Sequence, residues 1–185
     1  LFNLDRARTF RDASVRNQCA RNYFYGQDER LERAIQSVEG GYAQCVSSLH
    51  EPRASVDDLH VFILRRFAYL QHLRTEAAAR RSAEMVFAML DVQKTDIEQP
   101  AFREAVRNGV IVAMRHYAET MNIVDDLKVR IIRNHTPDPF FTSDDPAVLA
   151  NRWHQIDRRA LHQSFGIVSA GAVLFLPLSP TLLAV

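Results

Sequence analysis

The stretch SVDDLHVFILRRFAYLQHLRT, residues 55–75, decides the fold that this sequence predicts. Ser55 and Asp58 resemble a capping box, because an acid follows a serine by three residues just before an apolar run. Apolar side chains then recur at spacings of three and four residues, the repeat of a helix with one buried face. They are Leu59, Phe62, Ile63, Phe67, Leu70 and Leu73. The helical pattern runs to about residue 93, and because such a length is unusual for one helix, we expect a bend near Thr75.

Two further helices flank this one in the sequence. Residues 28–49 carry a second apolar stripe at the same spacings. It consists of Leu31, Ile35, Val38, Tyr42, Cys45 and Leu49. A third helix is predicted over residues 98–121, with Pro100 tolerated in its first turn and Gly109 allowing close packing. The sequence thus predicts three long helices, near residues 28–49, 55–93 and 98–121.

Residues 1–5 and 127–133 alternate apolar and polar residues in the manner of strands, while residues 172–176 are a continuous apolar run. We expect strands near residues 1–5, 127–133, 139–143 and 172–176. Residues 8–10 are the predicted hairpin partner of the first strand, and the turn 134–139 joins the second strand to the third. Residues 181–185 form a further apolar strand, joined to 172–176 by the turn Pro177 to Pro180. The predicted fold class is α+β and mainly α, with three long helices packed against a small antiparallel sheet.

Length and composition narrow the class of protein. We expect residues 1–185 to form a single domain, as a fragment or the ordered part of a longer chain. A net charge of +1 gives no electrostatic reason to expect nucleic acid or an anionic membrane as a partner. The apolar tail, residues 164–185, is long enough for a membrane span, but its two prolines and Gly171 favour buried strands. Cys19 and Cys45 form no metal-binding pattern and indicate a reduced, cytoplasmic protein.

The stretch FFTSDDPAV, residues 140–148, is a second point of interest. The side chains of Ser143, Asp144 and Asp145 can bond to neighbouring backbone N–H groups, and Pro146 ends strand pairing. A strand end of this kind can present a hydroxyl and two carboxylates for chemistry at the rim of a fold. The alternative is a plain turn.

Charged side chains on the first two helices give a candidate cluster. Glu32 and Glu39 are seven residues apart and share a helix face, about 10 Å apart along its axis. The alternative is that both are solvated charges at the edge of the apolar stripe. Gln71 and Arg74 share a face of the second helix. A half-buried Arg74 needs a carboxylate partner, for which Asp144 is the first choice and Glu39 or Glu32 the next.

Three further features of the sequence are weaker signals. The aromatic loop 21–26 packs against the next helix or, alternatively, stacks bases. His154 and His162 lie eight residues apart, without an acidic pattern, and give little support to a metal site. His72 is expected at the surface.

The order of these features resembles a bacterial family known as domain of unknown function 4238. Its members show an Asn-aromatic-Tyr loop, two glutamates seven apart, a Gln-x-x-Arg-Thr helix, a Thr-Ser-Asp-Asn-Pro turn and a Pro-Leu-Ser-Pro turn. The matching residues here are Asn22, Tyr25, Glu32, Glu39, Gln71, Arg74, Thr75, Thr142, Ser143, Asp144, Pro146, Pro177, Leu178, Ser179 and Pro180. Asp145 stands where the family usually has Asn. The resemblance covers nearly the whole chain and implies no activity.

Three hypotheses for the function remain open. The favoured one is a ligand-binding or regulatory module, in which the charges lock the helices to the sheet and the ligand binds elsewhere. The alternative is a metal-dependent hydrolase, a phosphodiesterase or nuclease of bacterial defence, with carboxylates holding Mg²⁺ and Arg74 stabilising phosphoryl charge. In the third, the charges are purely structural. The cofactor is otherwise unknown, and the candidate cluster consists of Glu32, Glu39, Gln71, Arg74, Ser143 and Asp144.

Overall fold

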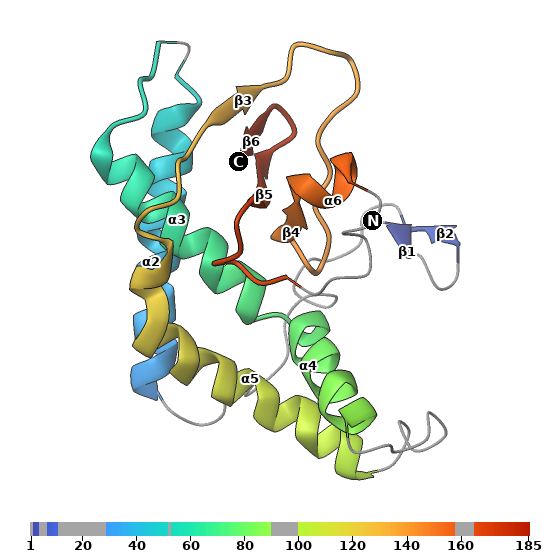
Figure 1. Cartoon of the computed structure of the whole chain (residues 1–185). Coiled ribbons are helices and arrows are strands. Elements are labelled where there is room, and N and C mark those ends of the chain that lie inside the picture. The colour runs from blue at the N-terminus through green and yellow to red at the C-terminus, as the bar shows by residue number, and fades with distance from the viewer. Residues whose placement is uncertain (1, 4–6, 11–28, 52, 90–99, 158–164) are drawn as a thin grey trace.

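Helices and a small sheet pack side by side in the computed structural model of the chain, and α4 and α5 lie together below the sheet (Figure 1). The structure describes residues 2–3, 7–10, 29–51, 53–89, 100–157 and 165–185. The helices are α2 (Glu29–Leu49), α3 (Asp58–Leu73), α4 (Glu76–Met89), α5 (Pro100–Thr120) and α6 (Arg152–Ile156), with the 3-10 helix η2 (Met121–Val124). The strands are β1 (Phe2–Asn3), β2 (Arg8–Thr9), β3 (Ile131–Arg133), β4 (Val148–Asn151), β5 (Ala172–Ser179) and β6 (Leu182–Ala184). The fold is α+β and mainly helical, as predicted.

The long helical pattern divides in two where a bend was predicted. Helix α3 ends at Leu73 and α4 begins at Glu76, so Arg74 and Thr75 form the junction. The start of α3 differs from the prediction, because Asp57 and not Ser55 caps it. The Asp57 Oδ1 atom accepts the His60 N–H at 2.9 Å, and His60 completes the capping box. Both residue types are good caps, and the one nearer the first helical turn serves here.

The buried face of α3 lies in its second half. Five consecutive residues, Phe67 to Gln71, are all buried. Leu59 and Phe62, by contrast, are 64% and 48% exposed, so the prediction of one apolar face along the whole helix is wrong for its first turns. A helix whose consecutive residues are all buried is surrounded on every side. Helix α3 therefore occupies the centre of the molecule at this point, with α2, α5 and the sheet around it.

The main sheet has the strand order β3-β6-β5-β4, with antiparallel pairing throughout. Strand β5 runs to Ser179, beyond the predicted residue 176, and its register with β6 shifts between Pro177 and Ser179. Proline has no N–H to give to the ladder, which accounts for an irregularity at this place. A hairpin of β5 and β6 forms as predicted, but it pairs residues 176–179 with 182–184, so Pro177 to Ser179 belong to the strand and not to the predicted turn. The pairing of Phe2 with Thr9 likewise confirms the first hairpin, within residues 2–3 and 8–9.

One predicted strand is wrong and one is too long. Residues 139–143 are irregular, and the strand that follows the turn is β4, at residues 148–151. Pro139 has no N–H for a ladder, and the Phe140 N–H donates to the Pro180 carbonyl at 2.9 Å, between β5 and β6. Residues 127–130 precede the short β3, whose partner is β6 and not residues 139–143. The predicted hairpin between 127–133 and 139–143 does not form.

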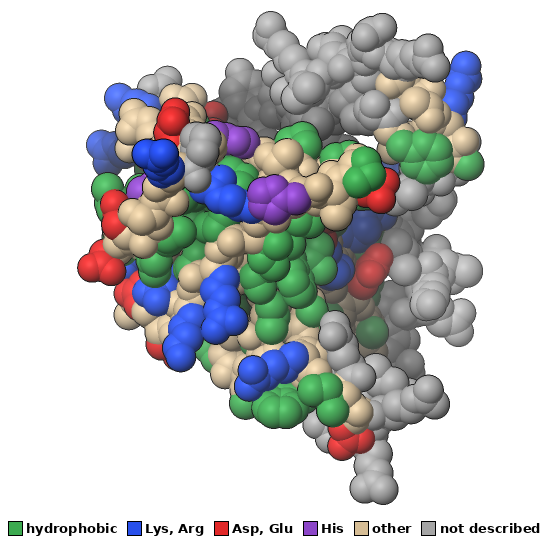
Figure 2. Space-filling view, turned by 90° about the horizontal axis from the view of Figure 1, so that it is seen from above, with side chains coloured by type: hydrophobic (Ala, Val, Ile, Leu, Met, Phe, Trp, Pro, Cys, Tyr) green, Lys and Arg blue, Asp and Glu red, His purple; other side chains and the backbone are tan. Residues whose placement is uncertain are grey.

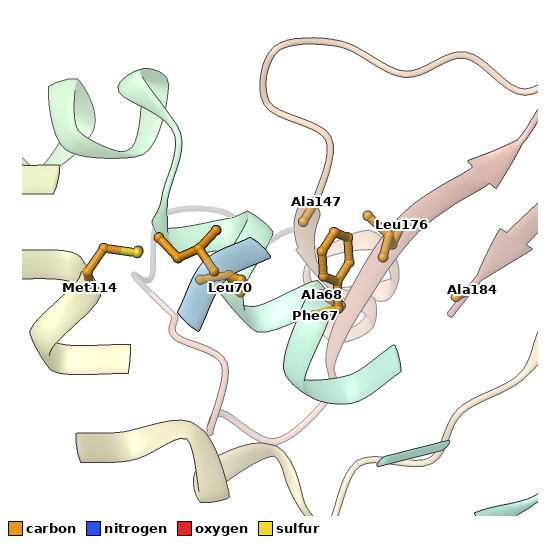
Figure 3. Close-up of a cluster of buried hydrophobic side chains, with 8 residues drawn as sticks. Phe67, Ala68, Leu70, Met114, Ala147, Leu176 and Ala184 are labelled. Carbon is orange, nitrogen blue, oxygen red and sulfur yellow. The ribbon is translucent and has the colours of Figure 1, made fainter. Parts of the chain in front are cut away.

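The core joins the helices to the sheet through α3. Phe67 lies near Ala147 and Leu176, while Leu70 lies farther along α3, on the side of Met114 of α5 (Figure 3). The Phe67 ring stacks on Tyr42 of α2 with a centroid separation of 3.6 Å and an interplanar angle of 11°. Leu176, Leu182 and Ala184 of the apolar tail are buried in the core, as predicted, whereas Val168 near its start is 75% exposed. In the described parts of the chain, no helix is long and apolar enough to cross a membrane.

Replacement of Leu70 by Ala tests the central position of α3. Leu70 is 1% exposed, so its truncation should leave a cavity and lower the free energy of unfolding by about 2–5 kcal/mol. Leu59→Ala on the same helix, at a residue 64% exposed, is the matched control and should change it by less than about 0.5 kcal/mol. Urea unfolding measures both variants, and equal losses would contradict the assigned burial.

Candidate functional site

Arg74 at the end of α3 is the centre of a small polar cluster. Its Nε donates to Gln71 Oε1 at 2.9 Å, and its Nη1 donates to Glu39 Oε1 at 2.5 Å. The guanidinium also lies 5.8 Å from the centroid of the Phe67 ring. The Arg74 side chain is 17% exposed and that of Glu39 is 43% exposed. The predicted need of Arg74 for a carboxylate is met, by Glu39.

Asp144, the first choice as the partner of Arg74, is not that partner. Asp144 is exposed, and within the described residues no hydrogen bond or ion pair joins it to Arg74. The turn itself explains this result, because the Asp145 N–H donates to Ser143 Oγ at 3.1 Å and Ser143 Oγ donates to the Asp145 carbonyl at 3.0 Å. This local ring directs the second carboxylate, and not the first, toward the helices.

Asp145 instead contacts the junction of α3 and α4. Its Oδ1 accepts the Thr75 hydroxyl at 3.0 Å, and its Oδ2 pairs with Arg81 Nη1. The same Thr75 Oγ1 accepts the Ala78 N–H at 3.0 Å and so caps α4. An asparagine at position 145, the usual residue in the family resembled above, would present an amide N–H₂ or a neutral oxygen to Arg81. The carboxylate therefore adds an ion pair that asparagine cannot make.

The other predicted members of the cluster do not join it. Glu32 is exposed and accepts a 3.4 Å hydrogen bond from Gln36 on its own helix. Ser143 is exposed and serves the turn. Three of the six candidate residues, Glu39, Gln71 and Arg74, are therefore brought together, and Glu32, Ser143 and Asp144 are not. The group consists of the Glu39–Arg74 ion pair and Gln71, and the Glu39 carboxylate is open to solvent.

His72, predicted at the surface, is half-buried. Its Nδ1 lies 3.5 Å from the Ala147 carbonyl oxygen, at the long limit of a hydrogen bond. Burial lowers the pKa of this imidazole; the Ala147 carbonyl opposes the shift, while the Arg81 guanidinium adds to it. His72 thus lies between the end of α3 and the residue that directly precedes β4.

Ser48, His60 and Asp57 form a hydrogen-bonded series that sequence reasoning missed. Ser48 Oγ lies 2.7 Å from His60 Nε2, and His60 Nδ1 lies 2.5 Å from Asp57 Oδ1. This order of hydroxyl, imidazole and carboxylate is that of a serine nucleophile and its base. The Ser48 hydroxyl, however, donates its single proton to the Cys45 carbonyl at 2.7 Å, and Asp57 is 61% exposed. The series joins the end of α2 to the cap of α3, and an Asp-x-x-His spacing at a helix start was its sequence signal.

A pocket of about 310 Å³ opens between α3, residues 127–130 and the strands β5 and β6. Its apolar walls include Leu64 and Ala68 of α3 and Leu174 and Leu176 of β5. The charged side chains that line it are all basic: Arg65, Lys128, Arg130 and Arg152. No Asp or Glu of the described chain lines it. Seen from above, hydrophobic side chains in the middle of the molecule are bordered by Lys and Arg, with most Asp and Glu toward the edges (Figure 2).

In the described part of the chain, no three His, Cys, Asp or Glu side chains are grouped to hold a metal ion. The His154 ring packs edge-on against Phe165 with a centroid separation of 4.7 Å, which is an ordinary packing contact. His162, Cys19 and the aromatic loop 21–26 lie outside the described residues.

Comparison with known proteins gives a family but no activity. The whole chain, residues 1–185, matches the family described as "Protein of unknown function (DUF4238)". The chain belongs to this family. No curated protein and no solved structure matches it. Of the DUF4238 motifs quoted above, the Gln71-to-Thr75 element makes the polar cluster at the end of α3, and the Pro177-to-Pro180 element leads from β5 into β6.

A double-mutant cycle on this DUF4238 protein tests the partner of Arg74. Arg74→Ala, Glu39→Ala and the double variant should give a coupling energy of about 1 kcal/mol, the upper end for pairs that solvent reaches. The same cycle with Asp144→Ala should give a coupling energy near zero. Urea unfolding measures all variants, and a larger coupling to Asp144 than to Glu39 would refute the pairing seen here.

The pH dependence of stability tests His72. Its folded-state pKa is lowered below the unfolded value of about 6.5, so the unfolded chain binds more protons and stability falls as the pH drops below about 6.5. His72→Gln should remove this part of the loss, so that the variant loses less stability than the wild type between pH 7 and pH 5. Urea unfolding at both pH values measures the effect. His135→Gln, at an exposed histidine, is the control and should lose as much stability as the wild type. Equal losses of unfolding free energy for His72→Gln and the wild type between pH 7 and pH 5 would contradict the lowered pKa of His72.

Proposed function

We propose that this protein is a ligand-binding module whose ligand is an organic anion with an apolar body. One observation carries the proposal: a pocket of about 310 Å³ with apolar walls is lined by four basic side chains and, within the described chain, by no acidic one. This volume is at the lower end of the range of small-ligand sites, which are mostly apolar with a few polar groups that fix orientation. The electrostatic complement of four cations is an anion.

The basic side chains of the pocket are not neutralised by carboxylates of the described structure. Lys128, Arg130 and Arg152 form no ion pair with any described residue. Arg65 is held by a 2.6 Å hydrogen bond from its Nη1 to the Asp125 carbonyl. Its buried Nε has no hydrogen-bond partner in the described structure. An anion in the pocket would gain charge-assisted hydrogen bonds without first breaking an ion pair.

This function matches the hypothesis in which the charged cluster locks the scaffold and the ligand binds elsewhere. Glu39 and Arg74 neutralise each other, and Asp145 is held by Thr75 and Arg81. The hydrolase hypothesis needs several of these carboxylates to converge on Mg²⁺. Glu32 and Asp144 do not approach the Arg74 pair in the contacts described, so no observation favours that function.

Titration with 8-anilinonaphthalene-1-sulfonate tests the proposal. This probe joins an apolar ring system to a sulfonate, and its fluorescence rises when it enters an apolar site. One saturable site should be seen. Replacing both Lys128 and Arg130 by Glu should weaken binding by about tenfold or more, because two attractive charges become repulsive.

Two controls separate a site from general stickiness. Arg103→Glu, an exposed residue of α5 outside the pocket lining, should leave the affinity unchanged. The neutral N-phenyl-1-naphthylamine should bind the wild type more weakly than the sulfonate. Equal affinity for the charged and neutral probes, or an equal effect of Arg103→Glu, would refute an anion site in this pocket.

A further inference from the structure

Ser48, His60 and Asp57 place a hydroxyl, an imidazole and a carboxylate in series, outside the lining of the proposed pocket. Ser48 Oγ lies 2.7 Å from His60 Nε2, and His60 Nδ1 lies 2.5 Å from Asp57 Oδ1. In a serine hydrolase, Nε2 likewise faces the nucleophile and Nδ1 faces the carboxylate. Each nitrogen of the ring therefore meets the partner that catalysis by a serine would need.

The contact with Asp57 determines which nitrogen of His60 carries a proton. The hydrogen bonds that Asp57 accepts from the backbone N–H and the ring of His60 lower the pKa of its carboxyl, so the carboxylate form is present near pH 7. A carboxylate only accepts, so the short contact requires the proton on Nδ1. In the neutral ring, Nε2 then has a free lone pair that faces Ser48 Oγ. This is the tautomer that a general base needs.

The Ser48 hydroxyl has two acceptors at the same distance. The Cys45 carbonyl oxygen and His60 Nε2 each lie 2.7 Å from Oγ. Rotation about the Cβ–Oγ bond redirects the proton from the carbonyl to Nε2 while the oxygen stays in place. When the ring is an imidazolium, its Nε2–H donates to Oγ, and the hydroxyl donates to the carbonyl. The contacts thus suit both protonation states of the ring, as a base that takes and returns a proton requires.

Buried neighbours hold the two helix ends that carry this series. Leu49, which follows the serine, is 0% exposed, and Leu64, about one turn after the histidine, is 1% exposed. Both belong to one apolar cluster, and Arg133 Nη2 also donates to the Leu49 carbonyl at 2.9 Å. The His60 N–H fixes Asp57 Oδ1 at 2.9 Å. The exposed carboxylate is therefore oriented by the start of α3, and the serine on the last turn of α2 is exposed.

We propose that Ser48 is the nucleophile of an acyl-transfer site for activated esters, with His60 as its general base and Asp57 as the residue that orients the ring. Oγ attacks the carbonyl carbon of the ester while Nε2 takes the hydroxyl proton. The bond between that carbon and the leaving oxygen then breaks, and Nε2 gives the proton to the leaving group. Water, deprotonated by Nε2, hydrolyses the acyl-serine to a carboxylic acid and free Ser48.

The three side chains also limit the class of ester. They make the attacking oxygen more reactive, but none of them donates to the oxyanion of the tetrahedral intermediate, whose stabilisation is usually the largest contribution to acyl transfer. An aryl ester needs less of that stabilisation, because its phenolate leaves readily. The expected substrate is therefore an acyl group on a weakly basic leaving group.

Hydrolysis of p-nitrophenyl acetate by the whole chain tests the proposal. Release of p-nitrophenolate should exceed that in buffer alone, and mass spectrometry after an acid quench should find the acetyl group on Ser48. Ser48→Ala should lower the rate by about tenfold or more, as expected for the loss of a nucleophile and its base. Ser47→Ala removes the neighbouring exposed serine, is the matched control and should keep the wild-type rate.

Two further variants test the base and its carboxylate. His60→Gln should lower the rate by about tenfold or more, whereas His50→Gln, at an exposed histidine just after α2, should not. Asp57→Asn should fold normally, because asparagine also caps helices, and should lower the rate, because an amide does not stabilise the imidazolium. Urea unfolding checks that each variant is folded under the assay conditions.

The proposal would be overturned by a wild-type rate in Ser48→Ala, or by acetyl groups on lysine or other side chains with none on Ser48. Wild-type rates in the folded Asp57→Asn and His60→Gln variants would also overturn it, as would no release above buffer. The outcome is separate from that of the ligand-binding function, because the three residues do not line the pocket. Ser48→Ala should bind 8-anilinonaphthalene-1-sulfonate as the wild type does.

Discussion

The burial of α3 on all its sides is the constraint on which the rest of the structure depends. Five consecutive buried residues, Phe67 to Gln71, cannot be covered by one neighbour. Helix α2 covers one side through the stacking of Tyr42 on Phe67, α5 covers another through Met114, and β5 closes the third through Leu176. Packing at native density then fixes the rotation of each neighbour about α3.

That rotation selects the polar contacts at the end of the helix. Tyr42 of α2 stacks on Phe67 of α3. Glu39 lies about one turn before Tyr42 and meets Arg74, which lies about two turns after Phe67. Asp145 accepts the hydroxyl of Thr75, the residue that caps the first turn of α4. Of the charged motif residues, Glu39 and Arg74 thus form one contact at the helix junction, and Asp145 forms a second with Thr75 and Arg81. The pocket with basic side chains lies elsewhere, which is why the proposed function is assigned to the pocket and not to the motif.

The sequence predicted the helices well because their signal is local. The three-and-four spacing of apolar residues located α2 and α5, and the length of the 55–93 pattern required a bend near Thr75. The choice of Glu39 over Asp144 could not be predicted, because it depends on how α2 is rotated against α3. The strand 139–143 failed because Phe140, Phe141 and Thr142 are too short a run to outweigh the prolines around them. The pocket had no sequence signal, since its flanks come from residues about forty positions apart that only the sheet brings together.

The way β5 divides its partners also orders the assembly of the sheet. Its pairing with β6 joins residues separated by a two-residue turn, so the loop to be closed is the shortest in the sheet. Strand β4 is joined to β5 through a longer connection, and β3 reaches β6 only after most of the C-terminal third of the chain has been made. Loop-closure entropy therefore places the β5–β6 hairpin first, β4 second and β3 last. The hydrogen bonds from Arg133 to the carbonyl oxygens of Leu49 and Glu51 would then form late, so that the end of α2 is fixed to the sheet by its last strand to join.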